Sequence, residues 1–280
     1  MLAAGLLLTT VTVGARPASA CDECKASKAG TKLGDMAILG NGTVRSWVTL
    51  DEAGKPTALG VTLSETALTG LPAKMQRMGE MEKTLSLPKT VALAPFDHIT
   101  LDWNPQGHEP SGVYDLPHFD IHFYTVSRDV RSRITATGQN VSTAQKQPDA
   151  RFIPAGYILP PIPPVPYMGA HWIDPKSPEF NKQPFTYTFL YGTYNGRQAF
   201  WEPMITKAFL ETNPDLTVPV AQPAAYETAG YYPTRYSVKY DAARKEYTIA
   251  LEGLTYRGGA GTATRVKTAA NHRKAAPRRK

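Results

Sequence analysis

The chain has 280 residues, 42% of them hydrophobic and 20% charged, with a net charge of +7. Between Arg257 and Lys280 there are eight basic residues and no acidic one, so the remainder is close to neutral. The chain before Arg257, which we call the body, also lacks a basic patch interleaved with aromatic residues, and this argues against specific nucleic-acid recognition. Its length suits one large β domain or two small ones.

Residues 1–20 have the pattern of an export signal. Leu2 to Val13 is an apolar run too short to span a bilayer. Ala18-Ser19-Ala20 follows it, a small-residue pattern that signal peptidase accepts. No charged residue precedes Arg16, so the usual basic start is missing. We expect a signal peptide and an exported protein, periplasmic or extracellular, with no transmembrane segment elsewhere. The alternative is a buried N-terminal strand or helix.

The only two cysteines, Cys21 and Cys24, follow the predicted cleavage point within a linker spanning residues 21–31. They fit a short disulfide or a free pair outside the cytoplasm. Alternatively, Cys21 is the lipid-bearing first residue of a lipoprotein, although Ala18 stands where such signals usually carry leucine. A redox or metal-binding pair is the third interpretation, and it lacks the helix or further ligands such sites normally need.

The first half of the body predicts strands joined by turns. Asn41-Gly42 is a strong hairpin signal between two apolar runs. The stretch Ala73–Lys83, rich in methionine and charge, is the best helix candidate. The remaining elements expected here are strands at Met36–Leu39, Thr43–Leu50 and Thr57–Leu63, a short helix from Ser64 to Ala67, and strands at His98–Trp103 and Phe119–Val126.

The second half begins with less regular segments. Arg131–Gly138 fits a strand or a short helix, and Pro154–Pro166, with six prolines, must be extended loop. Met204–Leu210 fits a helix. Two further hairpins are expected, Thr186–Tyr191 with Gln198–Trp201 around Asn195-Gly196, and Arg235–Tyr240 with Glu246–Leu251.

Together these elements predict a mainly β fold, α+β only in having a few short helices. We expect residues 32–257 to form a single antiparallel β-sandwich or barrel-like domain. Residues 258–280, rich in Gly, Ala and Thr and strongly basic, have little to bury and are expected to be a disordered tail.

Five of the six histidines lie between His98 and His171. In the strand predicted around Phe119–Val126, Phe119, Ile121 and Phe123 alternate with His118, Asp120, His122 and Tyr124. One face is therefore core and the other a row of potential ligands. Residues two apart on a strand are about 6.6 Å apart and can share an ion, whereas residues four apart are about 13 Å apart. A metal site here needs partners from elsewhere in the chain.

The expected partners are one histidine that precedes the strand in the sequence, one histidine that follows it, and a glutamate further downstream. Histidine and carboxylate ligands without thiolate suit zinc, copper or iron. The alternative is that each histidine has only a structural role and forms an ordinary hydrogen bond within the fold. The candidate metal ligands are His108, His118, Asp120, His122, His171 and Glu202.

Several motifs make the chain resemble the TTHB-type family of uncharacterised bacterial exported proteins, named after a Thermus thermophilus protein. The resemblance spans roughly Lys32 to Glu211 and implies a β-rich exported domain without an established activity. The motifs are Trp103-Asn104-Pro105, Gly107-His108-Glu109-Pro110, Gly112-Val113-Tyr114-Asp115, Pro117-His118-Phe119-Asp120, His122-Phe123-Tyr124, Met168-Gly169, His171-Trp172, Tyr191-Gly192 and Glu202-Pro203-Met204.

The sequence favours a non-catalytic exported domain that binds a transition metal through these residues. A second hypothesis is a metal-dependent hydrolase or oxidoreductase in which Glu202 or Asp120 is the general base. A third is an envelope interaction protein without metal. Motifs of serine hydrolases, nucleotide-binding folds and zinc proteases are absent from the sequence. No partner is indicated beyond a homo-oligomer.

Overall fold

The computed structural model describes residues 29–74 and 81–260. The predicted signal peptide, both cysteines, the centre of the predicted helix 73–83 and nearly all of the basic tail lie outside these ranges. Within the described residues, turns, loops and a few short helices connect fourteen strands. The strands are β1 Gly30–Leu39, β2 Gly42–Leu50, β3 Pro56–Ser64, β4 Glu82–Ser86, β5 His98–Asn104, β6 His118–Tyr124, β7 Ala170–Trp172, β8 Tyr187–Tyr194, β9 Arg197–Thr206, β10 Asp215–Pro219, β11 Gly230–Tyr232, β12 Arg235–Asp241, β13 Glu246–Glu252 and β14 Thr255–Arg257.

The first sheet has six antiparallel strands in the order β1-β2-β3-β13-β12-β10. Its first hairpin confirms the prediction, with the turn one residue earlier than expected. Leu39 pairs with Gly42, so Gly40 and Asn41 form the turn. Gly40 has a φ of 54°, which suits glycine at the first central position of a tight hairpin. The predicted hairpin of β12 and β13 is also confirmed.

The second sheet also has six antiparallel strands, in the order β4-β5-β6-β9-β8-β7. Its β8–β9 hairpin turns at Asn195 and Gly196, as predicted. Both residues have positive φ, 51° and 73°, which is the requirement of a type I′ turn. The sheet places β9 directly beside β6, followed by β8 and the edge strand β7, although all three are far from β6 in the chain.

We expect Gly196→Ala to lower the free energy of unfolding by about 1 kcal/mol, because an alanine at this positive φ is strained. Urea unfolding would measure the change. Gly258→Ala is the matched control, since its added Cβ meets no atom within 4 Å. Equal stability of the two variants would contradict the strain argument.

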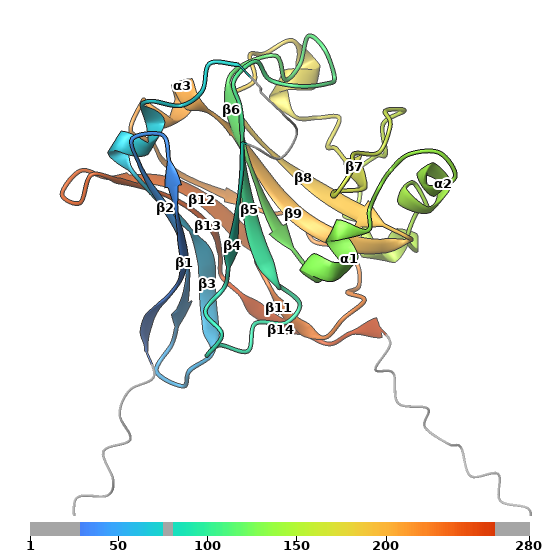
Figure 1. The fold of residues 1–280 in the computed structure, drawn as a ribbon. Helices are drawn as coiled ribbons and strands as arrows, with labels where there is room; N and C mark the ends of the chain where they lie inside the picture. The colour runs from blue at the N-terminus through green and yellow to red at the C-terminus, as the bar shows by residue number, and fades with distance from the viewer. Residues whose placement is uncertain (1–28, 75–80, 261–280) are drawn as a thin grey trace, which may run out of the picture.

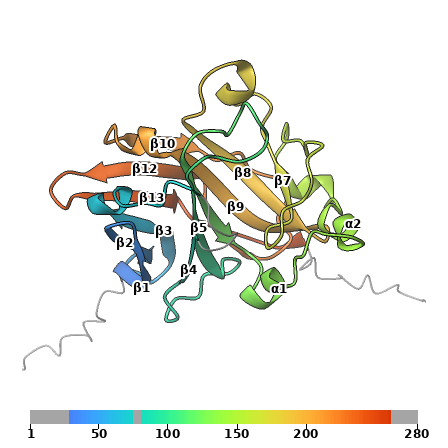
Figure 2. The ribbon, with the colours of Figure 1, turned by 45° about the horizontal axis from the view of Figure 1, so that its top comes forward.

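The two six-stranded sheets face each other as a sandwich (Figures 1 and 2), and the small β11–β14 sheet lies near one end (Figure 1). The barrel-like alternative is wrong, because each sheet keeps its own edge strands, β1 and β10 in the first and β4 and β7 in the second. Aromatic side chains join the sheets across the core. Phe189 on β8 lies 5.0 Å from Tyr236 on β12, ring centre to ring centre, and Trp201 on β9 is fully buried.

The helices are shorter than the sequence suggested. They are η1 Glu65–Leu68, α1 Arg128–Ser132, α2 Asn140–Ala144, η2 Ala150–Phe152, η3 Pro178–Asn181 and α3 Lys207–Leu210. The short helix after β3 is confirmed as η1. Among the described residues, no helix is long and apolar enough to cross a membrane.

The helices predicted over residues 73–83 and 204–210 are each wrong at the residues that pair with a neighbouring strand. Glu82 and Lys83, assigned to a helix by pattern, begin β4 and pair with β5. Met204 to Thr206 extend β9, and the helix starts only at Lys207, where the Thr206 side chain accepts a hydrogen bond from the Phe209 amide. Pairing in the sheet overrides local helix propensity in both places.

Candidate metal centre

Strand β6 is buried along its whole length, on both of its faces. Phe119, Ile121 and Phe123 point into the sandwich core, as the alternation predicted. The opposite face is also covered, by the loop between β5 and β6 and by the segment between β6 and β8 (Figures 1 and 2). Ring contacts place Phe185 against His118 and His171 near His122. The polar row is therefore an interior layer and not a solvent-facing one.

Three residues meet at one end of this layer, and we call them the loop triad: His108, His118 and Asp120. Nε2 of His108 lies 3.1 Å from Oδ2 of Asp120, and Nε2 of His118 lies 3.1 Å from Oδ1. Asp120 therefore presents one oxygen to each histidine. His118 and Asp120 are two apart on β6, and the loop before the strand supplies His108.

A second group, the strand triad, consists of His122 on β6, His171 on β7 and Glu202 on β9. Nε2 of His122 lies 3.3 Å from Oε1 of Glu202, and Nε2 of His171 lies 3.7 Å from Oε2. Again the carboxylate presents one oxygen to each histidine. All six residues named from the sequence are thus brought together, in two groups of two histidines and one carboxylate.

The division into two groups follows from strand geometry. His118 and His122 are four residues apart on one strand, too far apart to share an ion. Each combines instead with a carboxylate and with a histidine from outside the strand. The separation was predicted from the sequence, whereas the formation of two complete triads was not.

The tautomers of two histidines are set by backbone carbonyls. Nδ1 of His108 lies 2.7 Å from the carbonyl oxygen of Glu109, and Nδ1 of His118 lies 2.6 Å from that of Leu116. A carbonyl only accepts hydrogen bonds, so Nδ1 is the donor in both rings. In the neutral form Nε2 then carries the lone pair that faces Asp120, an arrangement common among metal-ligating histidines.

Several potential ligand atoms of the triads are buried and make no hydrogen bond. They are Nε2 of His118, Oδ1 of Asp120, Nε2 of His122 and Oε2 of Glu202. Although Nε2 of His118 and Oδ1 of Asp120 are only 3.1 Å apart, their geometry is not that of a hydrogen bond. An ion holding its ligands at 2.0–2.1 Å in a tetrahedron keeps those ligand atoms about 3.3 Å apart. The histidine–carboxylate distances, 3.1 Å in the loop triad and 3.3 and 3.7 Å in the strand triad, are near this value, and in each triad one set of potential ligand atoms lies within 4.8 Å of one another.

The loop triad holds unlike charges close together. Burial raises the pKa of Asp120, but the neighbouring His118 and His108 outweigh it and hold that pKa well below its usual range. Burial lowers the pKa of His108, yet the charge of Asp120 prevails and raises it to about 9. His108 therefore carries a proton at neutral pH when no ion occupies the triad.

The strand triad behaves similarly. Burial raises the pKa of Glu202 to about 8, although the charge of His122 opposes this. Burial lowers the pKa of His122, but Glu202 and Asp102 outweigh it and raise the value to about 9. Burial together with the charge of His122 lowers the pKa of His171 to about 3. This triad accordingly also holds protons at neutral pH, on groups other than His171.

Sequence reasoning missed a supporting layer on β5. Nδ1 of His122 lies 3.2 Å from Oδ2 of Asp102, and the Asn104 amide donates to Oδ2 of Asp120 at 2.8 Å. A carboxylate behind a ligating histidine orients the ring and raises its basicity. The signal was present in the sequence, since His98, Thr100, Asp102 and Asn104 alternate with apolar residues just as the β6 residues do.

An ion pair links helix α1, which lies beside the site, to strand β4 of the second sheet. Arg131, on helix α1, donates to both oxygens of Glu82 on β4, at 2.8 and 2.5 Å. Its guanidinium lies over the ring of Tyr124, which stacks on His98 and on His122. The predicted strand or helix at Arg131–Gly138 is helical only to Ser132, and this short helix positions the arginine.

Gly192 on β8 makes room for the strand triad. It pairs with His171 on one side and Phe200 on the other. A Cβ at this position would lie 2.0 Å from the Phe200 ring. That ring packs on both His122 and His171, with centre separations of 4.8 and 5.1 Å. Because Gly192 has no side chain, the Phe200 ring can pack against two candidate ligands at once.

We expect Gly192→Ala to lower the free energy of unfolding by about 1–3 kcal/mol, because the Phe200 ring must move. The displaced ring also disturbs His122 and His171, so any ion held by the strand triad should bind more weakly. Urea unfolding and metal titration would measure the two effects. A Gly192→Ala, Phe200→Leu double variant should recover part of the stability. If it does not, the clash with the ring is not the cause.

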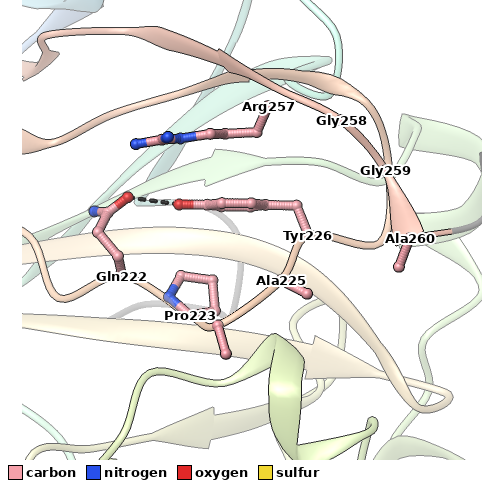
Figure 3. Close-up of a pocket in the computed structure, with 9 residues that line it drawn as sticks. Gln222, Pro223, Ala225, Tyr226, Arg257, Gly258, Gly259 and Ala260 are labelled. Atoms are coloured by element: carbon pink, nitrogen blue, oxygen red, sulfur yellow. Dashed lines mark hydrogen bonds between the residues drawn. The ribbon is translucent and has the colours of Figure 1, made fainter.

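A pocket of about 630 Å³ lies away from this layer, between the segment after β10 and the end of β14 (Figure 3). The Arg257 side chain lies along the Tyr226 ring, and the Tyr226 hydroxyl donates to Gln222 at 2.5 Å. Arg257 is the one charged residue among those lining the pocket. None of its lining residues is a histidine or carboxylate, so it offers no comparable ligand set.

Comparison with known proteins identifies one family. The family described as TTHB210-like, after the hypothetical protein TTHB210, matches residues 51–103. The matched segment contains β3, β4 and most of β5, including Asp102, and ends before the first triad residue. No curated protein and no solved structure matched the chain. The resemblance to this uncharacterised Thermus-type family is therefore confirmed over residues 51–103.

Proposed function

We propose that this protein binds transition-metal ions through the loop triad and the strand triad. One observation carries the proposal. In the two triads, four buried potential ligand atoms lack hydrogen bonds, although histidine nitrogens and carboxylate oxygens lie 3.1–3.7 Å apart there. Leaving a buried polar atom without a partner costs about 1–3 kcal/mol. A cation in each triad would satisfy these atoms and balance the carboxylates.

The ligand chemistry favours zinc, iron or copper. Each triad has two imidazoles and one carboxylate, and neither contains a thiolate. Two histidines and a carboxylate form the protein ligands of several zinc hydrolases and of non-haem iron oxygenases. Asp102 behind His122 and the carbonyls behind His108 and His118 supply the outer hydrogen bonds that such histidines usually have.

The cellular setting is also part of the proposal. The pattern at residues 1–20 supports export, so the ions would be bound in the periplasm or outside the cell. Fractionation of expressing cells, with N-terminal sequencing of the recovered protein, tests this. We expect the exported fraction to contain a chain that begins at Cys21. Mass spectrometry of this chain shows whether Cys21 carries a lipid. A full-length chain in the cytoplasm would contradict export.

A metal-dependent hydrolase or oxidoreductase is the second candidate. It is favoured because three protein ligands leave coordination positions open, and because His108 is partly exposed. Asp120 and Glu202 both face histidines within the triads, so neither is free to act as the general base that the sequence suggested. An enzyme would need another base. Hydrolysis and oxidation assays of the metal-loaded protein test this candidate.

The decisive experiment is metal analysis of the purified full chain after reconstitution with zinc, copper or iron. We expect close to two equivalents of bound metal per chain. A His118→Ala, His122→Ala double variant removes one ligand from each triad and should retain almost none. His272→Ala, a histidine outside both triads, is the matched control and should bind as the wild type does.

Circular dichroism of each variant shows whether it has folded. If the folded wild-type protein binds none of the three metals, the proposal fails and the third hypothesis, an interaction protein without metal, gains support. If the double variant binds as much metal as the wild type, the ions are held elsewhere.

A further inference from the structure

The two triads differ in how they reach solvent. The His108 side chain is 35% exposed, whereas the most exposed member of the strand triad, His171, is 11% exposed. His118, Asp120, His122 and Glu202 are all buried. The loop triad therefore has one ligand at the surface, and the strand triad is closed.

They also differ in what holds the ligands. His108 belongs to the connection between β5 and β6, where its amide donates to the carbonyl of Tyr114 within the same loop. Every strand-triad ligand lies on a strand of the second sheet. Phe200 packs against both histidines of that triad and covers them. Moving His108 disturbs a loop, whereas freeing the strand triad disturbs the sheet.

Building on the proposed function, we infer that the loop triad is an exchange site and the strand triad is a retained, structural site. A chelating acceptor reaches the loop-triad ion beside His108 and displaces the protein ligands one at a time. An ion in the strand triad leaves only after local opening of the sheet, which has a higher free energy than loop opening. The protein would thus pass one ion to an external acceptor with nitrogen or oxygen ligands while keeping the other.

The test is the time course of zinc release. The full chain is loaded with zinc, freed of unbound metal, and mixed with an excess of the chelating dye 4-(2-pyridylazo)resorcinol. We expect two phases of about one equivalent each, with the slow phase at least about tenfold slower than the fast one. His108→Ala should lose the fast phase alone, and His171→Ala the slow phase alone. His272→Ala should retain both.

Thermal unfolding gives a second readout. The chain that has released only its fast equivalent should unfold near the temperature of the fully loaded chain, and loss of the slow equivalent should lower that temperature clearly. Two equivalents leaving in one phase would overturn the division of roles while leaving metal binding intact. The same holds if His108→Ala removes the slow phase. Failure to bind any zinc, copper or iron would overturn the proposed function itself.

Discussion

Asp120→Asn is expected to lower the free energy of unfolding of the metal-free protein by about 3–5 kcal/mol, because it removes the charge from a buried ion pair. Asp120 lies 3.1 Å from both His108 and His118, and it accepts a hydrogen bond from Asn104. Asparagine has a similar shape, but one carboxylate oxygen becomes an amide donor that faces other donors. The metal-loaded protein should also lose one equivalent of zinc. Urea unfolding and metal analysis measure the two effects.

Asp97→Asn is the matched control for this variant. Asp97 is about half exposed, with a side-chain exposure of 44%, and its Oδ1 lies 2.7 Å from Nδ1 of His98. An asparagine there keeps an oxygen that accepts from the histidine, so the expected loss is roughly 1 kcal/mol or less. Similar losses for the two variants would mean that Asp120 contributes no more than an ordinary surface acceptor.

Metal affinity is expected to rise steeply with pH up to about 9. His108 and His122 have pKa values raised to about 9, so each triad holds at least one proton at neutral pH that an ion must displace. Below the pKa, affinity changes roughly tenfold per pH unit for each displaced proton. Between pH 6 and pH 8 the affinity of each triad should therefore increase about a hundredfold or more.

Isothermal titration of zinc in buffers with different ionisation enthalpies counts the released protons directly. At pH 7 the wild type should release at least two protons for two ions. His108→Ala should release fewer and bind one ion, and His272→Ala should match the wild type. An affinity that does not change between pH 6 and pH 8 would show that the triads are deprotonated already and that the carboxylates do not hold the histidines charged.

The strands were predictable because their patterns are local. Alternation over 118–124 and the Asn195-Gly196 turn both depend on neighbouring residues alone, and both are confirmed. The helix expected over 73–83 is wrong at Glu82 and Lys83 because pairing with β5 supplies hydrogen bonds that the local pattern cannot report. The same holds at Met204 to Thr206, where β9 continues beside β6 and β8.

For the site, the sequence identified the ligand candidates but not their grouping. Strand spacing already separated His118 from His122. Which outside residue joins which of them depends on the assembled sheet, since β9 lies beside β6 there and the His171 ring on β7 comes within 6.4 Å of the His122 ring. The supporting Asp102 belongs to the neighbouring strand β5, and that adjacency is a property of the fold as well.

By itself, the sequence determined the mainly β character, most strand and hairpin positions, and the set of six candidate ligands. These depend on alternation and turn residues, which act over a few neighbouring positions. Only the tertiary structure decided that the fold is a sandwich, that the polar face of β6 is buried, and that the six candidate ligands form two triads of different exposure. Those properties depend on contacts between residues distant in the chain, and local patterns do not encode such distances.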